Sequence, residues 1–217
     1  MSGECGAVLL SGGDLPAIRI SAILEVGFSQ RSYPQLQSRD TESILVRQAA
    51  SGDHTAFTTL YEMHAERVYR HVHFQVLDGH DAEDITQEVF VKAWKSLPRY
   101  KHTGAPFVSW LIVIARNTIV DHFRSRKNVR ELDETNEPHS QVDPVSGVEN
   151  EFGKAEVREA VLRLKGDRRT VILMHFIDGF SYEEIGRAIG KSEGAVRVIQ
   201  HRALKELKGL MPEADIL

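Results

Sequence analysis

Apolar residues recur at intervals of three and four along the chain from Asp40 onward. This spacing gathers them on one face of an α-helix, whereas the alternation of half-buried β-strands and the turn pairs of hairpins are missing from the sequence. The pattern therefore predicts an all-α protein. In the first segment the apolar positions are Ile44, Leu45, Ala49, Phe57, Leu60, Tyr61, Val68 and Tyr69.

Two further helices are expected in this part of the chain. Asp81 is the expected N-cap of the first, because Asp84 follows at the three-residue spacing of a capping box, and Pro98 lies beyond its end. A loop at residues 99–106 then leads to the second helix, which is expected over residues 107 to about 126. The two apolar stripes are Ile85, Val89, Phe90 and Trp94 in the first helix, and Trp110, Leu111, Ile114, Ala115, Ile119 and Phe123 in the second.

The C-terminal part of the chain has the pattern of a helix-turn-helix. Ile185 and Ile189 lie four residues apart on its first helix, and Gly190 can adopt the positive φ that ends that helix. Val196 and Ile199 face back from the second helix. In a helix-turn-helix the outward face of the second helix enters the major groove of DNA. Here that face consists of Glu193, Arg197, Val198, His201 and Arg202.

Charge divides the chain into two small domains. Residues 131–150 carry six acidic residues and no Lys or Arg, and with two prolines this composition is typical of a flexible linker. The linker accounts for the whole negative balance of a chain whose net charge is −4. We expect helical domains at residues 40–130 and 151–217, the second a four-helix module. Residues 1–39, rich in Gly and Ser and without a sustained period, are expected to form a flexible extension.

Composition narrows the class of protein further. The single Cys5 excludes an internal disulfide framework and a zinc finger built on cysteines of this chain. No apolar run is long enough to cross a bilayer, and the first 18 residues carry no Lys or Arg, unlike a secretory signal. A soluble, cytoplasmic protein without membrane insertion is expected.

The helix that begins near Asp81 has an acidic outer face. Glu83, Asp84, Gln87 and Glu88 lie opposite its apolar stripe. The acids of the first turn, Asp81 and Glu83, are explained by the helix dipole alone. Glu88 lies too far along the helix for that explanation, and its position suits a docking surface for a basic partner.

The helix at residues 107–126 combines aromatic, polar and basic groups. Asn117, Asp121 and Arg124 share one face and can form a polar track along a nucleic-acid strand, or Asp121 and Arg124 can simply pair on the surface. Trp110 is interpreted as a core residue, with base contact as the alternative. The basic residues of this region are Arg116, Arg124, Arg126, Lys127 and Arg130.

Three segments, in this order, resemble the signature stretches of extracytoplasmic-function (ECF) sigma factors, the two-domain transcription initiation factors of bacteria. Residues 81–94 read DAEDITQEVFVKAW, residues 110–121 read WLIVIARNTIVD, and residues 181–185 read SYEEI. The resemblance covers about residues 40–210. Three motifs in family order are specific, whereas a lone helix-turn-helix would be a weak signal.

The resemblance implies partners and roles. It implies binding of core RNA polymerase, through its β′ clamp helices and β flap, and binding of promoter DNA. The residues implied to contact the clamp helices are Asp84, Gln87 and Glu88. The residues implied to melt and hold the minus-ten strand, together with the loop at 99–106, are Trp110, Arg116, Asn117, Asp121, Arg124 and Lys127. The residues implied to read the minus-thirty-five duplex are Ser192, Glu193, Arg197, Val198, His201 and Arg202, with His175 where a phosphate-binding Arg is common.

Family resemblance also implies an anti-sigma protein that holds the factor inactive. The recognition helix departs from the family pattern at Ala195, Val198 and Ile199, where many relatives carry Thr, Ser and Arg. Val113 likewise replaces a frequent Arg. Promoter specificity therefore cannot be transferred from a relative.

Two alternatives belong to other classes. A dimeric helix-turn-helix regulator that binds operator DNA without polymerase would share residues 151–210, but would leave the acidic and basic faces of the first domain without a role. A zinc enzyme would use His64, His71, His73 and His80, yet His71 and His73 point about 200° apart on a helix and no His-Glu-x-x-His pattern occurs. No nucleophile elbow, phosphate loop or carboxylate pair is found, so we expect no enzymatic activity and no cofactor.

Overall fold

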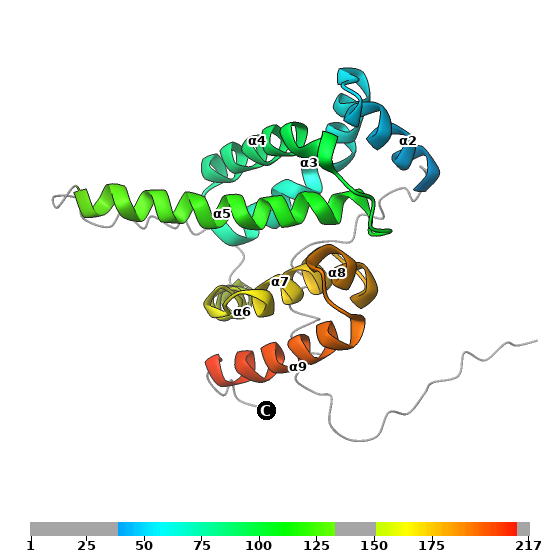
Figure 1. The fold of residues 1–217 in the computed structure, drawn as a ribbon. Coiled ribbons are helices and arrows are strands. Elements are labelled where there is room, and N and C mark those ends of the chain that lie inside the picture. The colour runs from blue at the N-terminus through cyan, green and yellow to red at the C-terminus, as the bar shows by residue number, and fades with distance from the viewer. Residues whose placement is uncertain (1–38, 133–150, 212–217) are drawn as a thin grey trace, which may run out of the picture.

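The computed structural model describes residues 39–132 and 151–211, and all regular elements in these two stretches are helices (Figure 1). The expected all-α fold is confirmed. Residues 1–38 of the predicted extension, most of the predicted linker and the side chain of Lys127 lie outside the described residues. Arg39, which was expected in the extension, begins the first helix.

The N-terminal bundle is built around one long helix. This helix, α3 (His54–Val76), packs against α2 (Arg39–Ala50), α4 (Gly79–Ser96) and α5 (Phe107–Leu132), and the short η1 (Leu97–Arg99) closes the end of α4. Most residues of the predicted apolar stripes form its core, but Ile44, Tyr61 and Phe123 are 46%, 40% and 46% exposed, so their assignment to the stripes is wrong. Its largest fully buried side chains are Leu60, Ile85, Leu97, Phe107, Leu111 and Ile112.

The prediction that Asp81 caps α4 is wrong. The N-cap is Asp78, whose carboxylate accepts a hydrogen bond from the Asp81 amide at 2.9 Å. Asp78 and Asp81 are themselves three residues apart, so the sequence offers two acidic caps at the same spacing. The earlier cap adds Gly79, His80 and Asp81 to the helix. Asp81 lies in the first turn and pairs with Arg126 of α5.

The C-terminal module contains the predicted helix-turn-helix. It comprises α6 (Glu151–Arg163), α7 (Asp167–Ile172), the π-helix η2 (Leu173–Ile177), α8 (Tyr182–Ile189) and α9 (Glu193–Leu210). Ser181 and Glu184 form a capping box at the start of α8, and Gly190 ends it at φ 70°. Val196 is buried, so the predicted direction of the recognition helix is confirmed.

The bundle and the module pack directly against each other, which the sequence pattern did not indicate. Figure 1 shows the module beneath the bundle, with α8 against the underside of α5. One buried apolar cluster includes side chains of both bodies. The module contributes Val171, Met174, Phe180, Ile185 and Val196 to this cluster. We call the contact between the two bodies the interdomain seam.

The turn of the helix-turn-helix depends on Gly186. A Cβ at this position would lie 2.6 Å from the Lys191 carbonyl oxygen, and the Lys191 amide donates to the Gly186 carbonyl at 2.8 Å. A side chain here would therefore push α8 away from the start of α9. Gly194, the second residue of α9, has open space where a Cβ would lie.

We predict that Gly186→Ala lowers the free energy of unfolding by about 1–3 kcal/mol, because the added methyl group collides with backbone that cannot rotate away. The matched control Gly194→Ala is expected to be neutral or to stabilise by up to about 1 kcal/mol, since a helical glycine only loses chain entropy. Urea denaturation followed by circular dichroism measures both variants. Equal midpoints for the two would show that the close approach at Gly186 is unimportant.

Candidate nucleic-acid and protein interfaces

The acidic face of α4 is exposed as predicted. Asp84, Gln87 and Glu88 all lie on the surface, whereas Ile85 and Val89, which alternate with them along the helix, are buried. The Glu88 carboxylate forms an ion pair with Lys92 one turn later, at 2.9 Å. This i,i+4 pair is solvent-exposed and contributes only a few tenths of a kcal/mol. Because this pair is weak, a cationic group of a binding partner can replace Lys92 as the partner of Glu88.

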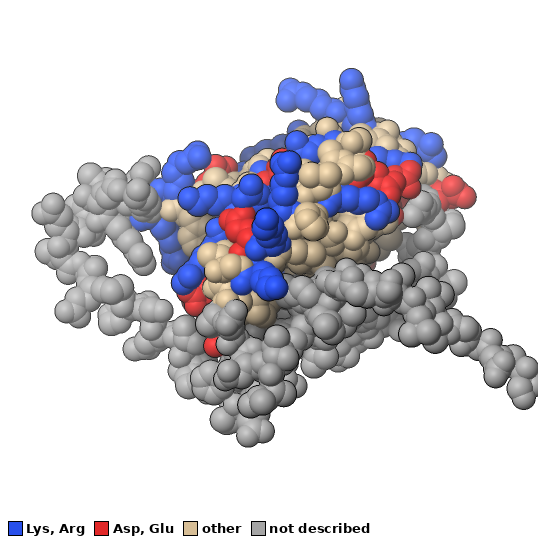
Figure 2. All heavy atoms as spheres, turned by 90° about the horizontal axis from the view of Figure 1, so that it is seen from below, with Lys and Arg blue, Asp and Glu red and all other residues tan. Residues whose placement is uncertain are grey.

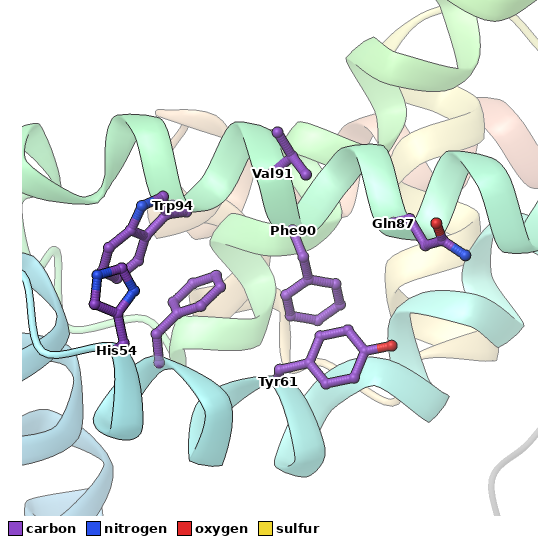
Figure 3. A pocket seen from close by; sticks show the side chains of 7 residues that line it. His54, Tyr61, Gln87, Phe90, Val91 and Trp94 are labelled. Carbon is purple, nitrogen blue, oxygen red and sulfur yellow. The ribbon is translucent and has the colours of Figure 1, made fainter.

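An apolar groove between α3 and α4 adjoins this face, and sequence reasoning missed it. Figure 3 shows aromatic side chains from both helices turned toward one another, with Gln87 at one end of the groove. The rings of Tyr61 and Phe90 lie 4.7 Å apart, and Val91 at the rim is 51% exposed. The lining residues are His54, Phe57, Tyr61, Gln87, Phe90, Val91 and Trp94.

This groove could have been found from the sequence by one signal. Phe90 and Trp94 were assigned to the core stripe, yet Val91 continues the apolar surface around the helix beyond the width that the core needs. An apolar side chain on that flank, next to the polar Gln87, is typical of a helix that packs on a partner as well as on its own core.

The polar track of α5 exists as a surface row. Asn117, Asp121 and Arg124 are all exposed, and the Asp121 carboxylate lies 3.8 Å from both Arg124 and Lys92. The surface pair between Asp121 and Arg124, which was the alternative interpretation, is therefore also present in this structure without DNA. Both contacts are long and exposed, so a nucleic-acid strand can replace them at little cost.

Trp110 packs among other aromatic rings, as its interpretation as a core residue requires. Its ring centroid lies 4.8 Å from that of Tyr100 and 5.4 Å from that of Phe107. Tyr100 begins the loop at 100–106 that was expected to capture a strand, so this aromatic cluster anchors the loop to the start of α5. Trp110 remains half-buried.

Glu42 of α2 contacts the end of the same loop. Its carboxylate lies 3.0 Å from His64 Nε2 and accepts a weak hydrogen bond from the Phe107 amide at 3.5 Å. Burial raises the pKa of Glu42, but the hydrogen bond and charge of His64 outweigh it, so the pKa lies below its ordinary value. Burial, and then the charge of Glu42, raises the pKa of the Tyr100 phenol. The anchor therefore combines a carboxylate with a neutral phenol at neutral pH.

The predicted outward face of α9 is exposed. Val198 is 49% exposed, and Arg202 forms no ion pair among the described residues. Arg197 is engaged locally: it donates to Glu193 at 2.6 Å, and its guanidinium lies 4.3 Å from the centre of the Tyr182 ring. Ser192 caps the helix by accepting from the Ala195 amide. His201 is exposed as well.

Lys and Arg predominate on the side of the molecule where α9 lies. Figure 2, seen from below, shows many Lys and Arg side chains and fewer Asp and Glu on this side, in the part not covered by grey atoms. The net charge of the chain is negative, but screening limits surface fields to about 8–10 Å at physiological salt. A local excess of cations is therefore enough to attract DNA.

His175 is placed differently from the other residues expected to read the duplex. It belongs to η2, where its Nδ1 lies 2.9 Å from the Phe180 carbonyl oxygen and its ring stacks on Tyr182 at 4.4 Å. These contacts give it a packing role at the start of α8. Its contact with a DNA phosphate stays a prediction.

The described residues form neither a membrane span nor a metal cluster. None of the described helices combines the length and the apolar character that a membrane span requires. In residues 39–132 and 151–211, no three His, Cys, Asp or Glu side chains are gathered in a way that could hold a metal ion. Of the histidines considered for zinc, His64 contacts Glu42 and His71 contacts Asp178.

Comparison with known proteins identifies a family for each of the two bodies. The family Sigma-70 region 2 matches residues 60–129, which lie in the bundle, and the family Sigma-70, region 4 matches residues 154–207 in the module. The ECF RNA polymerase sigma factor SigD of Mycobacterium tuberculosis is 30% identical over 171 residues, which cover 76% of this chain and 81% of SigD.

Two further relatives are informative. The ECF RNA polymerase sigma factor BldN of Streptomyces coelicolor is 33% identical over 174 residues, which cover 78% of this chain but only 65% of BldN. The solved structure of CnrH in complex with the cytosolic domain of CnrY aligns with a TM-score of 0.57 at 28% identity, over 78% of this chain and 96% of CnrH. On the matching sigma-70 regions and these relatives, the chain belongs to the extracytoplasmic-function family of RNA polymerase sigma factors.

Proposed function

We propose that this chain binds core RNA polymerase through α4 and directs it to promoters by reading the minus-thirty-five duplex with α9 and capturing the melted minus-ten strand with α5 and the loop before it. One observation carries the proposal: three helices each bury one face and expose another whose chemistry suits a different partner. These faces are acidic and apolar on α4, polar on α5, and cationic on α9.

The docking surface on α4 combines charge with an apolar groove. Asp84, Gln87 and Glu88 supply polar contacts, and the adjoining groove supplies the apolar area that a stable complex needs at its centre. Two packed helices with an open groove between them suit a helical partner. Under the proposal that partner is the β′ clamp helices.

The division of DNA contacts follows from the exposed groups. Opening a duplex costs a few kcal/mol for each unstacked base, and a polar row such as Asn117, Asp121 and Arg124 can offset that cost by holding the strand. A helix with exposed Arg side chains can read guanine edges in the major groove. The operator-binding alternative is not favoured, because the sigma-70 region 2 match covers the part of the chain that it leaves without a role.

An anti-sigma partner and a cytoplasmic location complete the proposal. CnrH, which aligns over most of this chain, was solved in complex with the cytosolic domain of another protein. We infer that a comparable protein covers the α4 face here. We also infer that the chain has no enzymatic activity of its own and acts on DNA only with the polymerase.

Run-off transcription with core polymerase on a promoter library tests the proposal directly. We expect a discrete set of promoters that require both this chain and the core enzyme. Specific binding of duplex DNA by the purified chain without core, with no run-off product when core is added, would instead support the operator-binding regulator.

We predict that Val91→Glu weakens the affinity for core polymerase about tenfold or more, because a carboxylate at the rim of the groove would be buried without a partner. Val120→Glu is the matched control, since Val120 of α5 is 49% exposed against 51% for Val91. Both positions are exposed, so neither variant should unfold. Fluorescence anisotropy with core polymerase, in the absence of DNA, measures the difference, and equal affinities would remove the groove from the interface.

We predict that Arg202→Ala lowers affinity for the minus-thirty-five duplex about 5- to 150-fold, since a side-chain contact to a base contributes about 1–3 kcal/mol. Arg197→Ala should have a smaller effect, because Arg197 must first leave Glu193 and Tyr182. Lys208→Ala removes the same charge near the C-terminal end of α9 and serves as the control.

Binding is measured by anisotropy with the polymerase holoenzyme and the duplex found in the run-off experiment. Core affinity should be unchanged in all three variants. A loss of core binding in the Arg202 variant would mean that the roles of the two domains are wrongly divided.

A further inference from the structure

Lys92 of α4 lies between the two surfaces that the proposed function assigns to core polymerase and to the DNA strand, and it belongs to neither of them. Helices α4 and α5 pack side by side (Figure 1). The Lys92 ammonium lies 2.9 Å from Glu88 Oε1 on its own helix and 3.8 Å from Asp121 Oδ2 on α5. Glu88 belongs to the docking surface of α4, and Asp121 belongs to the polar row of α5. One cation is therefore shared by a carboxylate of each surface.

A buried threonine holds the ammonium group between the two helices. Lys92 Nζ donates to Thr118 Oγ1 at 3.2 Å, and Thr118 is fully buried in α5. The Thr118 hydroxyl itself donates to the Ile114 carbonyl at 3.0 Å, so toward Lys92 it acts only as an acceptor. Because an ammonium group has three N–H donors, this hydrogen bond can persist whichever carboxylate the group faces. A small rotation of the flexible side chain is enough to bring Lys92 from Glu88 to Asp121.

Asp121 has a second cationic neighbour. Its Oδ1 lies 3.8 Å from Arg124 Nη1, and its Oδ2 faces Lys92 at the same distance. The side chains of Asp121 and Arg124 are 59% and 71% exposed, so this pair is weak and separates readily. An uncompensated Asp121 carboxylate would repel a DNA phosphate. A closer Lys92 would neutralise that charge and leave Arg124 free to bind the phosphate.

We propose that Lys92 is a positioning residue that couples core binding to strand capture. When a cationic group of core polymerase pairs with Glu88, Lys92 turns to Asp121, and Arg124 is released to a phosphate of the strand. The inference rests on the proposed function, since it links the two surfaces assigned there.

The exchange leaves no charge without a partner. In the free chain Glu88 pairs with Lys92, and Asp121 lies near both Lys92 and Arg124. With core and strand bound, Glu88 faces the core cation, Asp121 faces Lys92, and Arg124 faces the phosphate. Each step replaces one exposed ion pair by another, so the rearrangement costs little. Coupling between two binding sites is reciprocal, so the strand must also raise the affinity for core.

The test uses Lys92→Met in the full-length chain. Methionine keeps an unbranched apolar side chain, and Thr118 keeps its hydrogen bond to Ile114, so the variant is expected to fold. The matched control is Lys95→Met, which removes the same charge from an exposed position of α4. Lys95 forms no ion pair within the described parts of the chain. Circular dichroism during urea denaturation checks that both variants are folded.

Strand capture is measured with holoenzyme and a short, fluorescein-labelled single strand that covers the non-template minus-ten region of a promoter found by run-off transcription. We expect Lys92→Met to bind this strand about two- to fivefold more weakly than the wild type, which is the size of one exposed ion pair. Lys92→Arg should restore most of the affinity, because it keeps the charge. Lys95→Met should bind as the wild type does, and an equal loss in this control would exclude a specific role for Lys92.

A second substitution distinguishes this role from direct binding of a phosphate by Lys92. If Lys92 acts through Asp121, then Lys92→Met should weaken strand binding no further once Asp121→Asn is present. If Lys92 binds a phosphate itself, the same loss would appear in both backgrounds. That result would overturn the inference.

Core affinity is then measured with and without saturating strand. The factor by which the strand tightens core binding should be about two- to fivefold smaller for Lys92→Met than for the wild type, and unchanged for Lys95→Met. Direct contacts between strand and core enter both factors equally, so their ratio isolates the contribution of Lys92. Without strand, Lys92→Met should not weaken core binding, since it removes a competitor for Glu88. Equal factors for Lys92→Met and the wild type would show that the two surfaces are not coupled through this residue.

Failure of the proposed function gives a different result. If the wild-type chain mixed with core polymerase neither yields run-off product nor holds the single strand, the strand site itself is wrongly assigned. If wild-type holoenzyme holds the strand and Lys92→Met holds it equally well, only the coupling through Lys92 is excluded.

Discussion

A helix that buries one face has only the opposite face left for partners, and this constraint organises the whole molecule. Ile85 and Val89 fix which side of α4 faces the core, so Asp84, Gln87 and Glu88 must face outward. Val196 does the same for Arg197 and Arg202 on α9. The apolar pattern of the core therefore determines which residues of α4 and α9 are exposed to partners.

The same constraint explains what the sequence could predict. A period of 3.6 residues identified the helices, and the spacing from Ser181 to Glu184 and the position of Gly190 located the helix-turn-helix correctly. The error at α4 arose because Asp78 and Asp81 satisfy the same capping rule, and only the structure shows which carboxylate reaches an amide. The exposed residues of α9 followed directly from the direction of its buried residues.

The interdomain seam could not be predicted, for a physical reason. Its hydrogen bonds join residues more than 80 positions apart, such as Arg187 with Gly104 and His71 with Asp178, and none of them belongs to a periodic pattern. Asp178 is followed by Gly179 and resembles an ordinary turn. The groove was missed for a related reason: Phe90 and Trp94 read equally well as core, and only packing against α3 leaves part of their surface in an open groove.

The composition of the seam suggests how its opening is controlled. Removing one partner of a buried hydrogen bond costs about 1–3 kcal/mol, but separating both partners into water costs far less because each is hydrated again. Apolar groups such as Ile185 and Phe180, which share a buried cluster with the bundle, oppose opening more strongly, since each exposed side chain costs up to about 1.5–3 kcal/mol. The free chain therefore favours the packed arrangement of the bundle and the module, and any partner that separates them must bind the separated form better.

Chain length permits that opening. Eighteen residues lie between the end of α5 at Leu132 and the start of α6 at Glu151, and fully extended they span at most about 65 Å. Positions −10 and −35 are about 25 base pairs apart, or about 85 Å of B-DNA, which exceeds this span. However, α5 itself, with 26 residues, is about 39 Å long. The two bodies can thus bind both promoter elements at once only under one of two conditions. Either the connection between them is nearly extended, or their DNA-binding faces lie on the sides of the two bodies that are far from each other. Shortening the connection by even a few residues should therefore restrict promoter spacing more than it affects either domain alone.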